Sequence, residues 1–454
     1  MDLNLIYSDK RFGTVNSSNI SDARTQFQRD FDRIIFSSAF RRLQNKTQVF
    51  PLPGSVFVHN RLTHSLEVAS VGRSLGSLAG DFIVDTYASQ LTDASKDFYK
   101  HSLYNVIAAA CLCHDIGNPA FGHSGEDAIA SYFQKNKTEL QPLFSENEWQ
   151  DFVHFEGNAN AIRILTQKQE GKSEDGLQLT FATLASIAKY PCESSGSDNK
   201  STHRKKFGFF QSEISTFAHI AKFTDMVQES SSPMVFLRHP FVWLVEAADD
   251  ICYNIIDLED AHRLGIIEHS ECLKVLKLLI SEIGMDDQAR IETRLDSMTD
   301  RNDKIAYLRA KSIHALTMQA IEVYKTNFES ILKGNFNISL FDQIKNRCEA
   351  LQQITAFSYQ NIYNHRSVVE IENAGYNVMY QLLSHFVPPI LLDDAEKTKS
   401  DKKALKLIPS QFLYINGSRY QKVMGVLDYV SGMTDNYATD LYRKIKGIEI
   451  GMSI

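Results

Sequence analysis

Apolar residues recur at helical spacing along most of the chain, and this periodicity restricts the fold more than any other feature of the sequence. The clearest stretch has apolar side chains at Tyr104, Ile107, Ala108, Cys111 and Leu112, which defines one buried face of a helix. Similar patterns occupy residues 64–80, 239–258, 271–283, 305–333 and 369–386. The 22 glycines and 10 prolines in 454 residues make up about 7% of the chain, against an average of about 12%. We therefore predict an all-α protein whose one β element is a short extended pair at 46–58.

The chain is long enough to bury a sizeable core. It is 43% hydrophobic and 23% charged, and a protein of this length removes roughly 75% of its extended surface from water on folding. Two polar stretches, 193–206 and 393–405, are expected to be exposed loops. Neither is long enough to prove a domain boundary, and no internal repeat is present, so we predict one helical domain over residues 1–454.

The charge and the cysteine content exclude several classes of protein. With 48 Lys and Arg against 55 Asp and Glu, the net charge is -7, so no overall basic field draws the chain to nucleic acid or anionic lipid. The six cysteines are scattered, and a chain of this size needs no disulfides, so we expect reduced thiols and a cytoplasmic protein. No stretch approaches the roughly 18 apolar residues of a membrane span, and the N-terminus lacks the features of a signal peptide, so we expect no association with a membrane.

Two polar residues interrupt the clearest apolar stripe. Asp115 falls eleven residues after Tyr104, on the same helical face, and His114 precedes it. A buried carboxylate is too costly to desolvate unless it is paired or bound to a metal, and an adjacent imidazole is a natural co-ligand. The alternative is an ordinary histidine and a capping aspartate at a helix end stopped by Gly117 and Pro119.

A second group of polar residues shares one face of the apolar segment 241–258. Glu246, Asp249, Tyr253 and Asp257 are spaced three, four and four residues apart, which aligns them along a helix. A salt-bridged helix surface would explain the same spacing, but the apolar residues between them favour burial. This face is therefore expected to meet a polar partner.

Arg61 and His64 lie three residues apart on one expected helical face, which suits a metal ligand beside a phosphate clamp. Taken alone, a solvated arginine and a core histidine explain the pair equally well. Combined with His114, Asp115 and Asp249, however, His64 completes a set of two imidazoles and two carboxylates from three helices. Such a set favours Mn, Fe, Ni or Zn over an all-oxygen Mg site.

The segment 117–126 is rich in glycine, which allows a tight turn that brings His123 and Glu126 close to the expected metal site. Their spacing of three residues aligns them at the start of the next helix. A histidine oriented by a carboxylate is a common general acid and base. An ordinary loop histidine and a glutamate at a helix start remain the alternative.

At these residues the sequence resembles the HD-domain metal-dependent phosphohydrolases, and more narrowly the deoxyguanosinetriphosphate triphosphohydrolase family. The matching segments cover most of the chain in order: 39–49, 61–68, 114–126, 155–158, 189–191, 246–253 and 432–435. The resemblance implies an all-α HD-domain helical fold with additional C-terminal helices and at most a small β-hairpin. It also implies a catalytic core at about 55–265 and a helical extension, 266–454, that packs on the core and contributes to oligomerisation.

The resemblance implies a role for each site residue. The ligands of one divalent metal ion (Mn, Mg, Fe, Ni or Zn) would be His64, His114, Asp115 and Asp249, and the catalytic pair near the scissile phosphate would be His123 and Glu126. Arg61 and Lys189 match positions that hold the triphosphate, with Tyr190 beside them. Around the deoxyribose lie the positions of Gln48, Tyr253 and Asp257, where the tyrosine ring crowds the place of a 2′-hydroxyl.

Two positions depart from the family pattern. Animal members carry a lysine directly after the last metal aspartate, whereas this chain has Asp250, so Lys205 or Lys206 is expected to supply that phosphate contact. Bacterial members often carry a glutamine where this chain has Asn160, so no contact is assigned to that side chain. The preferred base is therefore open.

The function that the resemblance implies is the hydrolysis of a deoxynucleoside triphosphate, with dGTP favoured, to a deoxynucleoside and tripolyphosphate. One alternative is an HD phosphohydrolase that acts on another nucleotide phosphoester. A second is a nucleotide-sensing or single-stranded nucleic-acid-binding oligomer with little turnover, which the lysine-rich residues 203–206 would serve. The expected partners are the nucleotide, that nucleic acid in the second alternative, and further copies of the chain in a tetramer or hexamer.

Overall fold

The computed structural model describes residues 1–13, 23–50, 58–168, 176–284 and 288–449, and these residues are overwhelmingly helical. They form twenty-one α-helices and one two-stranded antiparallel sheet. The helices predicted from apolar periodicity are α3 (Arg61–Tyr87), α5 (Leu103–Cys113), α12 (Val242–Arg263), α13 (His269–Ile283), α15 (Arg301–Leu332) and α18 (Arg366–Leu391). The predicted all-α fold is confirmed.

The remaining α-helices were not predicted individually. They are α1 (Gln26–Ile35), α2 (Ser38–Arg42), α4 (Asp93–His101), α6 (His123–Lys135), α7 (Lys137–Leu140), α8 (Glu146–Val153), α9 (Gly157–Thr166), α10 (Phe181–Ile187), α11 (Ile214–Phe223), α14 (Gln288–Asp296), α16 (Leu340–Lys345), α17 (Glu349–Phe357), α19 (Lys399–Leu405), α20 (Arg419–Ser431) and α21 (Asp435–Ile445). A π-helical turn, Ser358–Tyr363, follows α17.

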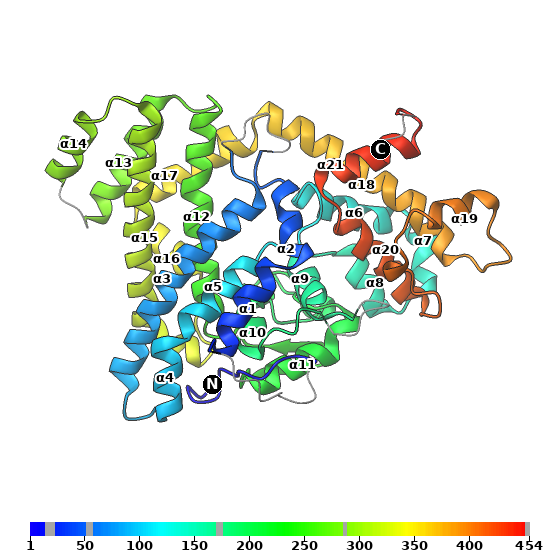
Figure 1. The fold of residues 1–454 in the computed structure, drawn as a ribbon, viewed down its shortest axis with the longest axis horizontal. Helices are drawn as coiled ribbons and strands as arrows, with labels where there is room; N and C mark the ends of the chain where they lie inside the picture. Colours follow the sequence, from blue (N-terminus) through cyan, green and yellow to red (C-terminus); the bar gives the residue numbers. More distant parts are fainter. Residues whose placement is uncertain (14–22, 51–57, 169–175, 285–287, 450–454) are drawn as a thin grey trace.

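The long helices α3, α12 and α15 lie side by side on one side of the molecule, and α5 packs against α3 (Figure 1). Glycines on α3 allow this close packing, because a Cβ atom at Gly76 would lie 2.8 Å from the Cα atom of Tyr104 on α5. The start of α3 is fixed by Asn60, whose side chain accepts a hydrogen bond from the backbone of Thr63. His64 therefore lies in the first turn of α3.

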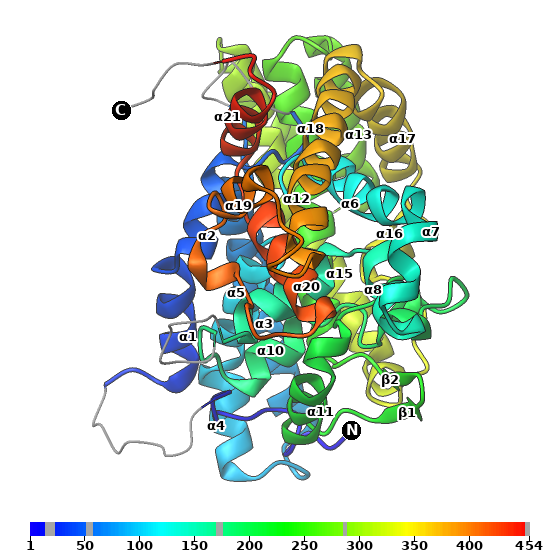
Figure 2. The same cartoon turned by 90° about the vertical axis from the view of Figure 1, so that its right-hand side faces the viewer.

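A second group of helices packs around α18 on the opposite side of the molecule. It contains α6, α8, α20 and α21, and Figure 2 faces it. The apolar core is correspondingly divided into two clusters, one running from Leu3 to Val368 and one from Ala120 to Leu441. Both clusters include residues from each side of residue 265, and the division into a core and a C-terminal extension stays a prediction.

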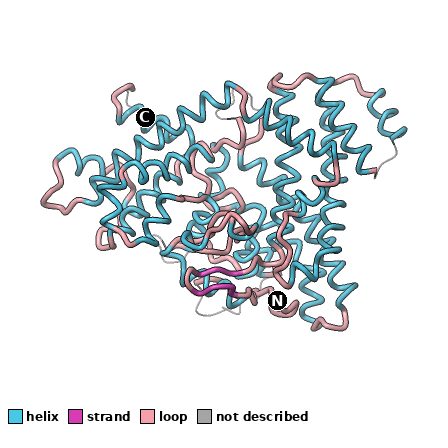
Figure 3. The backbone as a smooth tube through the Cα atoms, turned by 180° about the vertical axis from the view of Figure 1, so that it is seen from behind, coloured by secondary structure: helices cyan, strands magenta, loops and turns pink. Residues whose placement is uncertain are grey.

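The small sheet pairs β1 (Gln228–Ser231) with β2 (Met234–Phe236) and lies near the N-terminus (Figure 3). The expectation of at most a small hairpin is thus confirmed, and this hairpin is a different element from the extended pair expected at 46–58. Most of the extended pair expected at 46–58 lies outside the described residues, and at its edges Thr47 and Asn60 form an isolated bridge.

The prediction that residues 193–206 and 393–405 are exposed loops is partly wrong. In 193–206, Glu193 and Ser194 are buried, because the carboxylate of Glu193 accepts hydrogen bonds from the backbone of Met234 and the side chain of Gln211. In 393–405, helix α19 begins after Thr398, which forms a capping box. Local polarity concealed a buried turn in the first case and a helix in the second.

All six cysteines are free, as predicted, and all of them are buried. None of the helices in the described parts of the chain combines the length and the apolar character needed to cross a membrane.

The close contact of α3 with α5 makes a testable prediction. Gly76→Leu should lower the free energy of unfolding by about 1–3 kcal/mol, because the new side chain overpacks against α5. Ser77→Leu, one residue on and exposed, is the matched control and should change it by less than about 0.5 kcal/mol. Urea unfolding of both variants measures the difference, and equal losses would contradict the proposed role of Gly76.

Candidate active site

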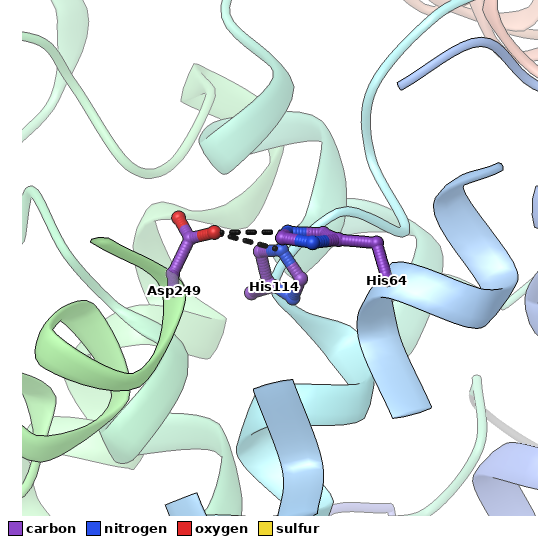
Figure 4. A group of neighbouring side chains, drawn as sticks. All are labelled: His64, His114 and Asp249. Carbon is purple, nitrogen blue, oxygen red and sulfur yellow. Dashed lines mark hydrogen bonds and ion pairs between the residues drawn. The ribbon is translucent and has the colours of Figure 1, made fainter. Parts of the chain in front are cut away.

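Three side chains meet at one point: His64 from α3, His114 directly after α5, and Asp249 from α12 (Figure 4). Their ligand atoms all lie within 4.8 Å of one another. One carboxylate oxygen, Oδ1 of Asp249, is 3.1 Å from Nε2 of His64 and 3.4 Å from Nε2 of His114. The polar residues that interrupted separate apolar stripes in the sequence are therefore neighbours in space.

The orientation of His114 fits a metal ligand. Its Nδ1 lies 2.7 Å from the carbonyl oxygen of Cys111, so Nδ1–H donates to the backbone and Nε2 faces the cluster. Nε2 is buried and makes no hydrogen bond with any described residue. Metal-bound histidines typically donate their second ring nitrogen to a carbonyl or carboxylate in this way, so the residues present fit a divalent ion.

Asp115, the fourth predicted ligand, lies at the edge of this cluster. Its Oδ2 atom is 3.5 Å from Nε2 of His114 and accepts a 2.7 Å hydrogen bond from Nη1 of Arg61. Its other oxygen accepts from the side chain of Asn118. The structure thus joins Asp115 to the arginine that was expected to bind phosphate, and its role as a ligand stays a prediction.

The charges within the cluster shift the pKa values of its members. Burial lowers the pKa of His114, but Asp115 and Asp249 outweigh burial and raise it to about 9. For Asp249 the directions are reversed. Burial raises its pKa, but the two imidazoles outweigh burial and hold the pKa well below its usual range. A divalent cation would occupy the place of the protons that the two carboxylates attract to this cluster.

A further buried contact ties α3 to α12, the helices that carry His64 and Asp249. The backbone N–H of His59 and its Nδ1 lie 2.9 and 2.8 Å from the carboxylate of Asp260, and Nε2 lies 3.4 Å from Glu67. Burial lowers the pKa of His59, but the interactions with Asp260 and Glu67 prevail and raise it to about 10. His59 is therefore a cation at neutral pH.

A cavity of about 530 Å³ opens beside the cluster, which is within the usual range for small-molecule sites. Ten of the twelve predicted site residues line it: Gln48, Arg61, His114, Asp115, His123, Glu126, Lys189, Tyr190, Asp249 and Tyr253. The other two, His64 and Asp257, are almost fully buried behind the wall. The structure thus brings the predicted set together around one space.

His123 begins α6, directly after two residues with unusual backbone angles. Phe121 has φ of 61° and Gly122 has φ of 57°, and a bulky residue in this region costs of order 1–3 kcal/mol. Glu126 accepts a 2.8 Å hydrogen bond from the backbone of Gly157. Among the described residues no hydrogen bond joins Glu126 to His123, and their action as a pair stays a prediction.

The two side chains nevertheless have shifted pKa values. His123 is open to the cavity. Its partial burial and the cations of Lys206 and Arg61 lower its pKa. Burial and the nearby Glu156 raise the pKa of Glu126 to about 8. Near neutral pH one wall of the cavity therefore offers a neutral imidazole and a protonated carboxyl group, a base and an acid.

Three cations on the cavity wall are each held by a carboxylate. Arg61 pairs with Asp115, Nζ of Lys189 lies 3.3 Å from Glu246, and Nζ of Lys206 lies 2.8 Å from Glu156. Of the two lysines considered for the missing phosphate contact, Lys206 lines the cavity and Lys205 does not.

The two departures from the family pattern also have definite places. Asp250 lines the cavity, and burial raises its pKa to about 8 although Lys189 opposes the shift. Asn160 points away from the cavity, because its amide donates to the carbonyl of Gly117 and to the hydroxyl of Ser431.

The far end of the cavity contains a residue that the sequence did not reveal. The ring of Tyr363 stacks on Tyr253, with centroids 5.6 Å apart and an angle of 13° between the planes, and its hydroxyl donates to Asp257 over 2.7 Å. Nearby, Oε1 of Gln48 is buried and has no hydrogen-bond partner among the described residues. Tyr363 comes 106 residues after Asp257, and no periodic pattern in the sequence connects them.

The helical fold and its His-Asp cluster define an HD-domain protein, a class of metal-dependent phosphohydrolases. The HD domain model matches residues 61–228, and the model of the phosphohydrolase-associated domain matches residues 342–444. The cluster residue Asp249 lies between the two matched regions.

Three relatives are each called deoxyguanosinetriphosphate triphosphohydrolase-like protein. One from Synechocystis sp. is 37% identical over 99% of this chain and its own full length, and one from Pseudomonas aeruginosa is 36% identical over 98% and 99%. A third, from Listeria monocytogenes, is 34% identical over 98% and 99%. The chain therefore belongs to the deoxyguanosinetriphosphate triphosphohydrolase-like family.

The cluster predicts how metal content depends on Asp249. Asp249→Ala should remove the ion and the activity together, because it deletes the oxygen that both imidazoles face. The loss of metal affinity should exceed the roughly 10–100-fold loss typical of mutating a residue that only hydrogen-bonds to a metal ligand. His123→Ala is the matched control, which should keep the ion while turnover falls roughly 10²–10⁴-fold. Metal analysis of both purified proteins decides. An ion retained by Asp249→Ala, or lost by His123→Ala, would require the ligands to be reassigned.

The His59 contact predicts a pH-dependent stability. The pKa of His59 in the fold, about 10, lies above its ordinary value of about 6.5, so its stabilising effect is complete below pH 6.5 and declines between pH 6.5 and 10. The difference in Tm between the unmodified protein and His59→Gln should therefore be largest near pH 6 and smaller near pH 10. A difference that grew with pH would contradict a charged His59.

Proposed function

We propose that the protein hydrolyses deoxynucleoside triphosphates, with dGTP favoured, to a deoxynucleoside and tripolyphosphate. The proposal rests on the residues that line or adjoin this cavity. They are the His-Asp cluster, three cations and the stacked Tyr253–Tyr363 pair. Metal, triphosphate and sugar therefore each have a matching part of the wall. The names of the relatives support the same substrate class.

In this reaction, water attacks the α-phosphorus, the bond from that phosphorus to the 5′-oxygen breaks, and the 5′-oxygen takes up a proton. His64, His114 and Asp249 would hold a divalent ion, with Asp115 as the predicted fourth ligand. Such an ion supplies Lewis acidity at a phosphoryl oxygen. His123 and Glu126 manage the proton at the reacting oxygens, since one is neutral and the other protonated near neutral pH.

The cations hold the part of the substrate that leaves. A substrate of charge near -4 is repelled at long range by a chain of net charge -7. Arg61, Lys189 and Lys206 oppose this repulsion locally. Because each is already held by a carboxylate, the triphosphate meets cations whose positions are fixed before it binds.

Selection of the sugar follows from one face of α12. Asp249, Tyr253 and Asp257 succeed one another at one-turn intervals, about 12 Å in all at 1.5 Å per residue. With the α-phosphate near Asp249, the deoxyribose lies at Tyr253, and a 2′-hydroxyl meets the tyrosine ring. Tyr363 lines the cavity, and its hydroxyl donates to Asp257, which does not line it. We therefore expect the hydroxyl of Tyr363, rather than the predicted carboxylate of Asp257, to meet the 3′ side of the sugar.

A carboxylate supports guanine as the favoured base. Glu372 of α18 lines the cavity together with Val368. A carboxylate can accept hydrogen bonds from both N1–H and the 2-amino group of guanine, whereas adenine presents an acceptor at N1. Burial and Asp127 raise the pKa of Glu372, and two such donors would stabilise its ionised form.

Product analysis tests the proposal directly. The protein with Mn or Mg should release tripolyphosphate and a deoxynucleoside from dGTP, and should leave dGMP and cyclic nucleotides intact. Release of single phosphate groups, or turnover of a monophosphate only, would instead support the alternative of an HD phosphohydrolase with another nucleotide substrate. The absence of any turnover, with binding retained, would support the nucleotide-sensing alternative.

The sugar pocket makes a sharper prediction. A pocket that must reject only an added hydroxyl discriminates by about 10²-fold, so kcat/KM for dGTP should exceed that for GTP by about this factor. Tyr253→Ala should reduce the ratio to below about tenfold, because the clash with the 2′-hydroxyl is removed. Tyr190→Phe, which leaves the Tyr253–Tyr363 stack intact, is the control and should keep the ratio. Equal use of dGTP and GTP by the unmodified protein would exclude the deoxyribose-specific function.

A further inference from the structure

One carboxylate of the C-terminal region connects two segments of the cavity wall. Asp435, the first residue of α21, is 1% exposed. Its Oδ1 atom accepts a 2.9 Å hydrogen bond from the backbone N–H of Phe121, and its Oδ2 atom accepts from the backbone N–H and the hydroxyl of Thr47. Thr47 directly precedes Gln48, and Phe121 comes two residues before His123.

The end of α20 makes further contacts with the same segments. The buried amine of Lys46 donates to the carbonyl oxygens of Asn118 and Ser431 over 2.5 and 2.9 Å. The amide of Asn160 donates to the carbonyl of Gly117 and to the hydroxyl of Ser431. Three residues of the segment 117–121 are thus connected to residues 431–435. Phe121 bonds Asp435 directly, whereas Gly117 and Asn118 are connected to Ser431 through the side chains of Asn160 and Lys46.

Phe121 itself is fixed from two directions. Its N–H is held by Asp435, and its ring packs so closely on Gly375 of α18 that a Cβ atom at that position would overlap it. Its φ of 61° is a conformation that persists only where the surroundings impose it. Here the surroundings that impose it are supplied by C-terminal helices.

We propose that Asp435 is a positioning residue of the hydrolase. It sets the place of the segment before His123 and of the segment before Gln48 at the same time, although it is not part of the cavity wall. Turnover therefore depends on a carboxylate that touches neither the substrate nor the ligand cluster. The part of this inference that concerns turnover rests on the proposed function, whereas the part that concerns the segment 117–122 does not.

Asp435→Asn is the sharpest variant, because all three groups that bond this carboxylate are donors. An amide offers one acceptor and one N–H group, so in either orientation one of the two segments meets a donor in place of an acceptor. Asp428→Asn is the matched control. Asp428 is also a buried carboxylate of the C-terminal region, but it accepts from Arg163 on α9 over 2.7 and 2.8 Å and does not contact the segment 117–122.

Hydrogen exchange tests the positioning without any substrate. Asp435→Asn should speed exchange in the peptide that contains Phe121 and leave peptides from α3 and α12 unchanged, and Asp428→Asn should not affect the Phe121 peptide. Unchanged exchange at Phe121, or faster exchange throughout the Asp435→Asn protein, would overturn the proposal.

Kinetics test the consequence for turnover. In Asp435→Asn the bound metal should be retained and kcat for dGTP should fall about 10- to 100-fold, the effect of a small misplacement of a catalytic group. In a His123→Ala background the same change should lower kcat by less than about twofold, because the effect of Asp435 on kcat is exerted through His123, whereas losses in kcat that multiply would overturn the proposal. If the unmodified protein turned over none of the four dNTPs, the proposed function would fail while hydrogen exchange still decided the role of Asp435.

A milder variant covers the case in which Asp435→Asn does not fold. Thr47→Val removes one of the three donors and keeps the backbone bonds. It should raise KM for dGTP more than it lowers kcat, because Thr47 is adjacent to Gln48 and distant in sequence from His123. Kinetics identical to those of the unmodified protein, with Tm also unchanged, would overturn the link between Asp435 and the Gln48 segment.

Discussion

The site depends on one buried carboxylate oxygen that faces two imidazoles. Oδ1 of Asp249 lies within 3.4 Å of both His64 and His114, and the three residues are placed by three different helices, α12, α3 and α5. Burying such groups is costly unless their charges are compensated at short range, so α3, α5 and α12 must keep a close and exact arrangement. The contact at Gly76 and the His59–Asp260 pair both serve this arrangement.

Local periodicity made much of the fold and of the cluster predictable. Because a helix repeats every 3.6 residues, the spacing from Tyr104 to Asp115 and from Asp249 to Tyr253 already showed which side chains share a face. Tyr363 could not be found in this way, since only the folded chain brings it to Tyr253. The sheet β1–β2 could not be found in this way for a related reason: β1 is a polar segment, Gln228–Ser231, without an alternating apolar pattern, and the buried Glu193 that bonds β2 lies far back in the sequence.

The cations of the cavity illustrate a second limit of sequence reasoning. Arg61 and Lys189 stood out by resemblance, but their carboxylate partners, Asp115 and Glu246, are fixed only by the fold. Burial alone lowers the pKa of Lys189, and Glu246 reverses this effect and keeps the amine charged. The cation that a phosphate needs is therefore kept charged by an acidic residue of the same cavity wall.

The C-terminal region belongs to the site as much as to the stability of the fold. Its π-helical turn supplies Tyr363, its helix α18 supplies Val368 and Glu372, and all three line the cavity. The second apolar cluster joins α6, which begins with His123, to α18, α20 and α21. Since the helix that carries His123 packs on this region, while His64 and Asp249 belong to α3 and α12 and His114 directly follows α5, the two groups of helices must be held together for the cavity to have both its His-Asp cluster and the wall that carries His123 and Glu126.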